Sequence, residues 1–119
     1  MKPKMCAWLG LFFIWIGAGS GIAGTLAYTG VNLSGAEFGE ALPGTYGIDY
    51  TYPLQSEVDY FRNKGMNIVR LPFAWERLQR SANAALDPGE FARLHSFVSP
   101  ATGKGMYVIL DGTARPTPP

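Results

Sequence analysis

Cysteine is almost absent from this chain. The only one, Cys6, lies inside an uncharged apolar run near the N-terminus and not after the small-residue stretch that precedes a lipid-modified cysteine. A single thiol forms no disulfide within a chain. We therefore expect neither a disulfide nor a cysteine metal site in the rest of the protein.

An excess of charge of one sign is also lacking. Apart from Lys2 and Lys4 at the N-terminus, eight basic residues face nine acidic ones. A nearly neutral chain has no electrostatic footprint for nucleic acid or for an anionic membrane surface. Neither is expected as a partner.

The first 27 residues differ in character from the remainder. Lys2 and Lys4 precede an uncharged apolar run over residues 5–16, and a stretch of small residues follows this run. This layout is typical of a secretory signal peptide. We expect residues 1–27 to be removed and the protein to be secreted, to an extracellular or periplasmic location.

The cleavage site and the membrane alternative both depend on this segment. Cleavage just before Tyr28 would use the small residues Thr25 and Ala27, and residues 18–20 offer a competing site. The alternative is an uncleaved anchor, because residues 5–23 nearly reach the roughly 20 apolar residues that a spanning helix needs. With cleavage, no stable membrane association is expected.

A short motif, Lys-Gly-Met, occurs twice. Residues 64–71 read KGMNIVRL and residues 104–111 read KGMYVILD. In each copy a glycine ends a helical stretch and an apolar, β-rich run follows, as when a helix C-cap leads into a buried parallel strand. With the run TGVNLS at 29–34, this predicts three strands, at 29–34, 67–73 and 106–110, in a β/α repeat. Helices would cover one face of the last strand and a barrel interior the other.

Two helices are predicted between these strands. The first has Ser56 as its N-cap and stops at Gly65. The second begins with Asp87 as its cap, Pro88 at the first helical position and Glu90 three residues after the cap.

The second helix has an apolar face and an internal proline. The residues expected on its buried face are Phe91, Leu94, Val98 and Ala101. Pro100 removes a backbone donor, so it should kink or end the helix about one turn early.

Residues 35–53 are rich in glycine, proline and aromatics and follow neither regular period, which predicts a long loop. Long loops in barrels usually carry function. A closed eight-unit barrel takes roughly 250 residues, and this chain has 119. The predicted fold class is α/β: an incomplete (β/α)8 TIM barrel with only the first three strands and two helices, in residues 28–119. One unpaired sheet edge and one poorly covered face make the stability of such a unit doubtful.

Four segments resemble, in this order and spacing, the opening third of a glycoside hydrolase family 5 cellulase. They are GVNLSGAEFG (30–39), LPGTYGIDYTYP (42–53), KGMNIVRLPFAWERLQ (64–79) and ATGKGMYVILD (101–111). The resemblance implies an eight-unit barrel that hydrolyses β-1,4-glucan with retention, with a glutamate acid/base after strand four and a glutamate nucleophile at strand seven. Both positions lie beyond Pro119. The chain is therefore expected to be an N-terminal fragment of a secreted endo-β-1,4-glucanase, inactive alone, and to need no metal or organic cofactor.

The resemblance also implies a role for Arg70. It matches the arginine that, near the end of strand two, holds the nucleophilic carboxylate ionised and oriented. A guanidinium among apolar neighbours is costly to bury without a carboxylate partner, and a bidentate pair keeps the pKa of that carboxylate low. The alternatives are a structural ion pair with Glu37, Glu76 or another acid, or a tip exposed at a strand end.

The remaining acids are expected to be structural. Glu37 follows the first strand as a satisfied loop carboxylate without a catalytic role, and Asp111 ends the third strand at the same barrel mouth. Glu76 is expected on a solvated turn with Arg77 and Arg80.

Aromatic residues are the candidates for sugar contact, because they cover the apolar faces of sugar rings. We select Trp75 for this role. Tyr46, Tyr50 and Tyr52 are weaker candidates, since aromatics in a glycine-rich loop are also ordinary packing.

The resemblance stops after Asp111, where the family continues with a histidine-asparagine pair and this chain has Gly112 to Arg115. The single histidine, His95, is expected on the surface of the second helix. A frameshift or premature end would explain this loss of resemblance. A noncatalytic secreted protein that binds glycan or another partner is an alternative function, and mannan or another β-glycan is an alternative substrate.

Overall fold

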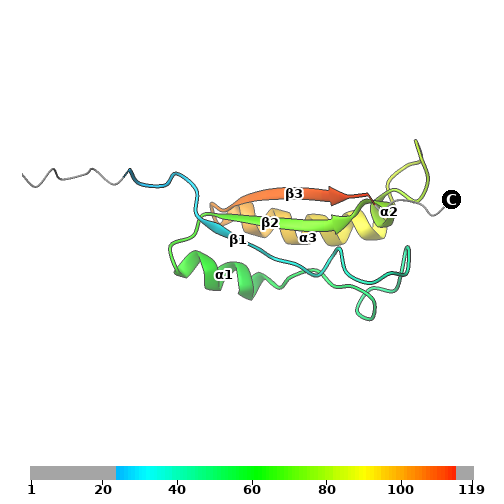
Figure 1. Ribbon diagram of the computed structural model, residues 1–119, viewed down its shortest axis with the longest axis horizontal. Coiled ribbons are helices and arrows are strands. Elements are labelled where there is room, and N and C mark those ends of the chain that lie inside the picture. Colours follow the sequence, from blue (N-terminus) through cyan, green and yellow to red (C-terminus); the bar gives the residue numbers. More distant parts are fainter. Residues whose placement is uncertain (1–23, 115–119) are drawn as a thin grey trace, which may run out of the picture.

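The computed structural model describes residues 24–114, so residues 1–23 of the predicted signal peptide lie outside the described part. Three parallel strands form one sheet in the order β1-β2-β3 (Figure 1). They are β1 (Gly30–Asn32), β2 (Ile68–Ala74) and β3 (Tyr107–Thr113). Helical crossovers join the neighbouring strands, so the predicted β/α repeat is confirmed for these units.

The strand ends differ from the prediction by a few residues. β1 is shorter than the predicted 29–34. β3 continues beyond Leu110, because residues 111–113 pair in parallel register with residues 72–74 of β2. The pairing of β3 with β2 therefore extends two residues beyond Asp111, where the resemblance ends.

Three helices accompany the sheet, namely α1 (Gln55–Asn63), α2 (Trp75–Leu78) and α3 (Pro88–Gly103). The single-turn helix α2 was not predicted. The N-cap of α1 is Leu54 and not Ser56. The backbone N–H of Leu54 donates to the Glu57 carboxylate at 2.7 Å, and this contact fixes the start of the helix two residues earlier than predicted.

The repeated Lys-Gly-Met motif forms the same helix end twice, as predicted. Gly65 and Gly105 have φ angles of +86° and +80°, a region that glycine enters without steric cost. The N–H of Met66 donates to the carbonyl of Phe61, and that of Met106 to the carbonyl of Ala101, each at 3.2 Å. Both ends are Schellman caps, which turn the chain directly into the next strand.

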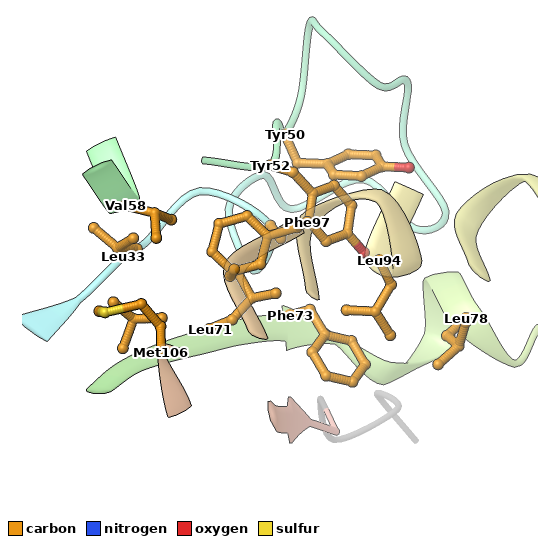
Figure 2. Close-up of a cluster of buried hydrophobic side chains, with 13 residues drawn as sticks. Leu33, Tyr50, Tyr52, Val58, Leu71, Phe73, Leu78, Leu94, Phe97 and Met106 are labelled. Carbon is orange, nitrogen blue, oxygen red and sulfur yellow. The ribbon is translucent and has the colours of Figure 1, made fainter. Parts of the chain in front are cut away.

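The core lies between one face of the sheet and the helices α1 and α3 (Figure 2). Val69 and Leu71 of β2 are fully buried there, with Val58 of α1 and Phe97 of α3. Residues two apart on a strand share a face. Arg70, between Val69 and Leu71, therefore belongs to the opposite face.

The buried face of α3 differs from the prediction in one residue. Leu94 and Ala101 are buried and Val98 is partly buried against the core, as expected. Phe91, however, is 48% exposed, and Glu90 is buried in its place. The prediction failed because Glu90 finds hydrogen-bond partners inside, which makes an inward carboxylate tolerable.

Pro100 does not end α3 early, because the helix continues to Gly103. The carbonyl of Pro100 still accepts from the N–H of Lys104 at 3.1 Å. Ala101 is fully buried, so packing of the last turn outweighs one missing backbone donor.

The third strand is not covered on both faces, contrary to the prediction. Tyr107, Ile109 and Leu110 are each about half exposed. Within residues 24–114, β3 is an edge strand with apolar side chains toward both faces. The expectation of burial assumed neighbouring units that this part of the chain does not contain.

Residues 33–54 form the predicted long loop, at the end of the sheet to which the strands point (Figure 1). One side chain organises it. Arg77 of α2 is fully buried and donates to the carbonyls of Ala36 and Phe38 at 2.7 and 2.6 Å. Further contacts reach the carbonyls of Gly39, Ala41 and Pro43.

The expectation that Arg77 lies on a solvated turn is therefore wrong. Its guanidinium also lies 3.9 Å from the centre of the Tyr50 ring, a cation–π contact. A planar group with five donors can serve several loop carbonyls at once. Loop backbone without regular structure needs such partners when it is buried.

We expect Asp87→Ala to lower the urea midpoint of unfolding at pH 7. Asp87 accepts the N–H of Glu90 at 2.8 Å, and this bond is the main cause of the lowered pKa of its carboxyl. A lowered folded-state pKa gives stability that is present above about pH 4 and lost as pH falls further. The difference between variant and parent should therefore shrink below pH 4.

Asp87→Asn is the matched control, because asparagine caps helices as well as aspartate does. It also removes the ion pair with Arg80. An Asn variant as unstable as the Ala variant would show that the ion pair, and not the cap, matters.

We expect Arg77→Met to destabilise the folded chain by about 3 kcal/mol, because several loop carbonyls lose their donor. Hydrogen exchange of the amides of residues 35–51 should accelerate more than that of β2. Arg80→Met, at an ion pair that is more than a third exposed, should change stability by less than about 1 kcal/mol. Equal effects of the two variants would contradict the role of Arg77.

Candidate functional site

β2 and β3 both point to the end of the sheet where the long loop and α2 lie, and the shorter β1 leads into that loop (Figure 1). In parallel β/α sheets, ligands bind at this end, where the strands reach their carboxyl termini. The sequence candidates Arg70 and Trp75 both come from β2 and the residue that follows it.

Arg70 is held by both strands that flank β2. Its Nη1 donates to Oδ1 of Asn32, the residue paired with it on β1, at 2.6 Å. Its Nη2 forms an ion pair with Oδ2 of Asp111 on β3. The side chain is 42% exposed, so the guanidinium is fixed but open to solvent on the uncovered face of the sheet.

Of the alternatives for Arg70, an ion pair with another acid is the one that the structure shows. The acid with which it pairs in the structure is Asp111, one of the other acids that the sequence left open. A guanidinium carries five N–H donors, so the contacts with Asn32 and Asp111 use part of its capacity. A fixed fork of this kind can bind a further carboxylate or a hydroxyl oxygen.

The other candidate acids occupy structural positions. The Glu37 carboxylate accepts the N–H of Gly35 at 2.8 Å, as expected for a satisfied loop carboxylate. His95 is exposed on α3 beside the ring of Phe91, which confirms its expected surface position. Within residues 24–114, no group of three acidic, histidine or cysteine side chains could hold a metal ion.

Trp75 opens α2 directly after β2 and is 40% exposed. Its Nε1 donates to Oε1 of Gln79 at 3.2 Å. The ring of Phe73 lies 6.3 Å away, centre to centre. Trp75 is thus an anchored and half-open aromatic at the edge where the strands end.

The tyrosines of the loop separate into two groups. Tyr50 and Tyr52 are buried, and their hydroxyls donate to the Glu90 carboxylate at 2.6 and 2.8 Å. For these two, packing is the correct interpretation and sugar stacking is not. Tyr46 remains 44% exposed, with the Arg93 guanidinium 4.7 Å from its ring centre.

Glu90 joins the loop to the start of α3. It is buried, and it accepts from Arg93 at 2.9 Å as well as from both tyrosines. Burial, together with the hydrogen bond to Glu90, raises the pKa of Tyr50 to about 12. The same causes raise the pKa of Tyr52. Both phenols thus stay neutral as donors to the carboxylate.

Sequence reasoning missed the buried roles of Arg77 and Glu90. Glu90 was recognised only as a residue of the helix start, and no local pattern reveals that its side chain turns inward. Asn32 carried a usable signal, because it lies opposite Arg70 in the natural register of two parallel strands.

A pocket of about 190 Å³ opens in the long loop, lined by Gly35, Phe38 and residues 47–51. Arg70, Asp111 and Trp75 do not line this pocket.

Among residues 24–114, no helix has the length and apolarity needed to cross a membrane.

We expect stability to fall as pH rises from about 10 to above 12. A pKa raised in the folded state gives stability that is present below the unfolded value near 10 and lost as pH passes the folded value. Absorbance at 295 nm should show a late tyrosine step that coincides with loss of near-ultraviolet circular dichroism. Tyr50→Phe should reduce this step, and Tyr28→Phe, at an exposed ring, should leave it in place. A variant of Tyr50 with an unchanged late step would refute the assignment.

Comparison with known proteins gives one family. The profile described as cellulase, glycosyl hydrolase family 5, matches residues 26–117. Endo-beta-1,4-glucanase B of Emericella nidulans is 39% identical over 85 residues, which cover 71% of this chain and 26% of the relative. Probable endo-beta-1,4-glucanase B of Aspergillus oryzae is 40% identical over 114 residues, covering 85% of this chain and 34% of the relative.

Solved structures give the same result. An endo-beta-1,4-glucanase from Xanthomonas axonopodis pv. citri is 50% identical with a TM-score of 0.67, covering 70% of this chain and 27% of that one. The endoglucanase Cel5A of Pseudomonas stutzeri, in complex with cellobiose, is 38% identical with a TM-score of 0.69, covering 75% and 27%. XacCel5A, in complex with cellopentaose, is 46% identical with a TM-score of 0.66, covering 68% and 26%.

The predicted fold class, three units of a (β/α)8 barrel, is confirmed by this likeness, with α2 as an additional turn of helix. The chain spans about a quarter to a third of the length of these relatives. Since the family profile covers most of the chain, from residue 26 to residue 117, the protein belongs to the glycosyl hydrolase family 5 cellulases.

Proposed function

We propose that this chain forms the N-terminal part of a secreted, retaining endo-β-1,4-glucanase that hydrolyses β-1,4-glucan. The family match over residues 26–117 carries this proposal. The polar cluster of Arg70, Asn32 and Asp111 on the uncovered face of the sheet supports it, because in a closed barrel of this type this face would line the interior below the substrate site.

Arg70 is the supporting catalytic residue in this proposal. In retaining hydrolysis one carboxyl group protonates the leaving oxygen, while a carboxylate about 5 Å away attacks the sugar. The attacking group must be ionised and aimed at the sugar. A guanidinium that two neighbouring strands hold in place favours the charged form and fixes its orientation.

The acid/base and the nucleophile come from units outside these 119 residues, so the chain alone is inactive. Trp75 contacts the apolar face of a sugar ring. Residues 1–27 act as a secretory signal, and the start of the family match at residue 26 supports this boundary. The reaction requires only carboxyl groups and water, and no cofactor.

We expect no hydrolysis of carboxymethylcellulose or cellopentaose by the 119-residue chain. Joining residues 28–113 to the remaining barrel units of Pseudomonas stutzeri Cel5A should give an active enzyme. In this chimera, Arg70→Met should lower kcat on the order of 100-fold, the loss that follows removal of one preorganised donor.

Arg62→Met is the matched control, since Arg62 lies on α1 and its Nε donates to the carbonyl of Lys104 at 3.0 Å. It should leave kcat unchanged. Turnover by the 119-residue chain would refute the external location of the carboxylates. A folded chimera in which Arg70→Met is fully active would refute the role of Arg70, and cleavage of mannan in place of glucan would change the assigned polymer.

The alternative is a secreted, noncatalytic protein that binds glycan or another partner. The half-open Trp75 and the exposed aromatics of the long loop favour this alternative if the chimera folds and remains inactive. Cooperative melting of the isolated chain together with saturable oligosaccharide binding would then identify it.

A further inference from the structure

The indole of Trp75 is anchored at its pyrrole end. Its Nε1 donates to Oε1 of Gln79, one turn further along the chain, at 3.2 Å. The amide of Gln79 is itself held, because its Nε2 donates to the carbonyl of Ala84 at 2.8 Å. The ring plane is therefore tied to the backbone through a side chain that has little freedom of its own.

The benzene end of the same indole rests against β3. A Cβ placed on Gly112 would lie 3.1 Å from Cε3 of Trp75 and 3.2 Å from Cζ of Phe73. Gly112 is paired with Phe73 in the parallel register, and Phe73 is buried. A side chain at this position would therefore push one or both rings aside by a few tenths of an ångström.

Two other half-exposed aromatics, Tyr46 and Tyr60, each have a cation over the ring. The Arg93 guanidinium lies over the ring of Tyr46, and the Lys64 ammonium lies 5.4 Å from the centre of the Tyr60 ring. Trp75 instead has a fixed plane, an exposed fraction of 40%, and a place at the carboxyl ends of the strands. A fixed platform loses little conformational entropy on binding.

We propose that Gly112 and Gln79 are positioning residues that fix the indole of Trp75 as a stacking platform for a β-1,4-linked glucose unit. This inference rests on the proposed function and adds to it. Gln79 holds the ring at one end, and the missing side chain of Gly112 leaves space for the other end beside β3. A pyranose ring then stacks on the outer face of the indole.

The test uses the full chain with Trp8→Phe and Trp15→Phe, which leaves Trp75 as the single tryptophan. Its fluorescence is titrated with cellopentaose, and with maltopentaose as a control of equal length and different linkage. The test variants are Gly112→Ala and Gln79→Met. Gly103→Ala is the matched control, because a Cβ there meets nothing within 4 Å.

We expect a saturable fluorescence change with cellopentaose and a much weaker one with maltopentaose. Gly112→Ala and Gln79→Met should each weaken binding at least tenfold, and Gly103→Ala should bind within twofold of the parent. If circular dichroism shows that Gly112→Ala does not fold, the binding affinity of Gln79→Met decides whether the proposal holds. Unchanged binding by the folded variants overturns the proposal, and so does a parent whose Trp75 does not respond to cellopentaose.

Kinetics separate this inference from the proposed function. In the chimera with the Pseudomonas stutzeri units, Gly112→Ala should raise KM for cellopentaose at least fivefold and leave kcat within twofold. An active chimera in which Gly112→Ala changes neither constant refutes the platform alone. An inactive chimera whose Trp75 still binds cellopentaose refutes the hydrolase assignment and keeps the platform.

Discussion

Two buried charged side chains hold the long loop, and the geometry of the strand-end edge depends on them. Arg77 binds backbone carbonyls of the first half of the loop, and Glu90 binds the hydroxyls of Tyr50 and Tyr52 in the second half. A loop of this length has no ladder of its own to satisfy its polar groups. Charged groups from α2 and α3, which follow β2 in the chain, supply those partners.

The same construction links the loop to the site. Arg77 lies two residues after Trp75 in α2, and Glu90 lies in the first turn of α3. The unit that follows β2 thus contributes Trp75, which lies at the ligand end of the sheet, and also Arg77 and Glu90, which fix the loop between β1 and α1. Arg70 follows this logic on the sheet itself, where Asn32 and Asp111 hold it from both sides.

Local signals in the sequence predicted what local interactions determine. The glycines of the Lys-Gly-Met motifs, the cap at Asp87 and the strands after each motif were correct, because a few neighbouring residues decide these features. The inward side of α3 was assigned to Phe91, because amphipathic patterns treat every carboxylate as solvated. Arg77 and Glu90 are buried only because distant loop atoms satisfy them, and no spacing rule records such contacts. For the same reason the sequence predicted a strand position for Arg70 but did not identify Asp111 as the acid with which it forms an ion pair.

The paired Schellman caps have a consequence for the order in which the fold is built. Gly65 and Gly105 each end a helix a few residues before the next strand begins. β1 pairs with β2, and β2 with β3, each about 40 residues further along the chain. Loop closure over so short a distance carries a small entropic penalty. Each of the two strand pairings can therefore form within its own chain segment, and we expect the sheet to be assembled by pairing of consecutive strands.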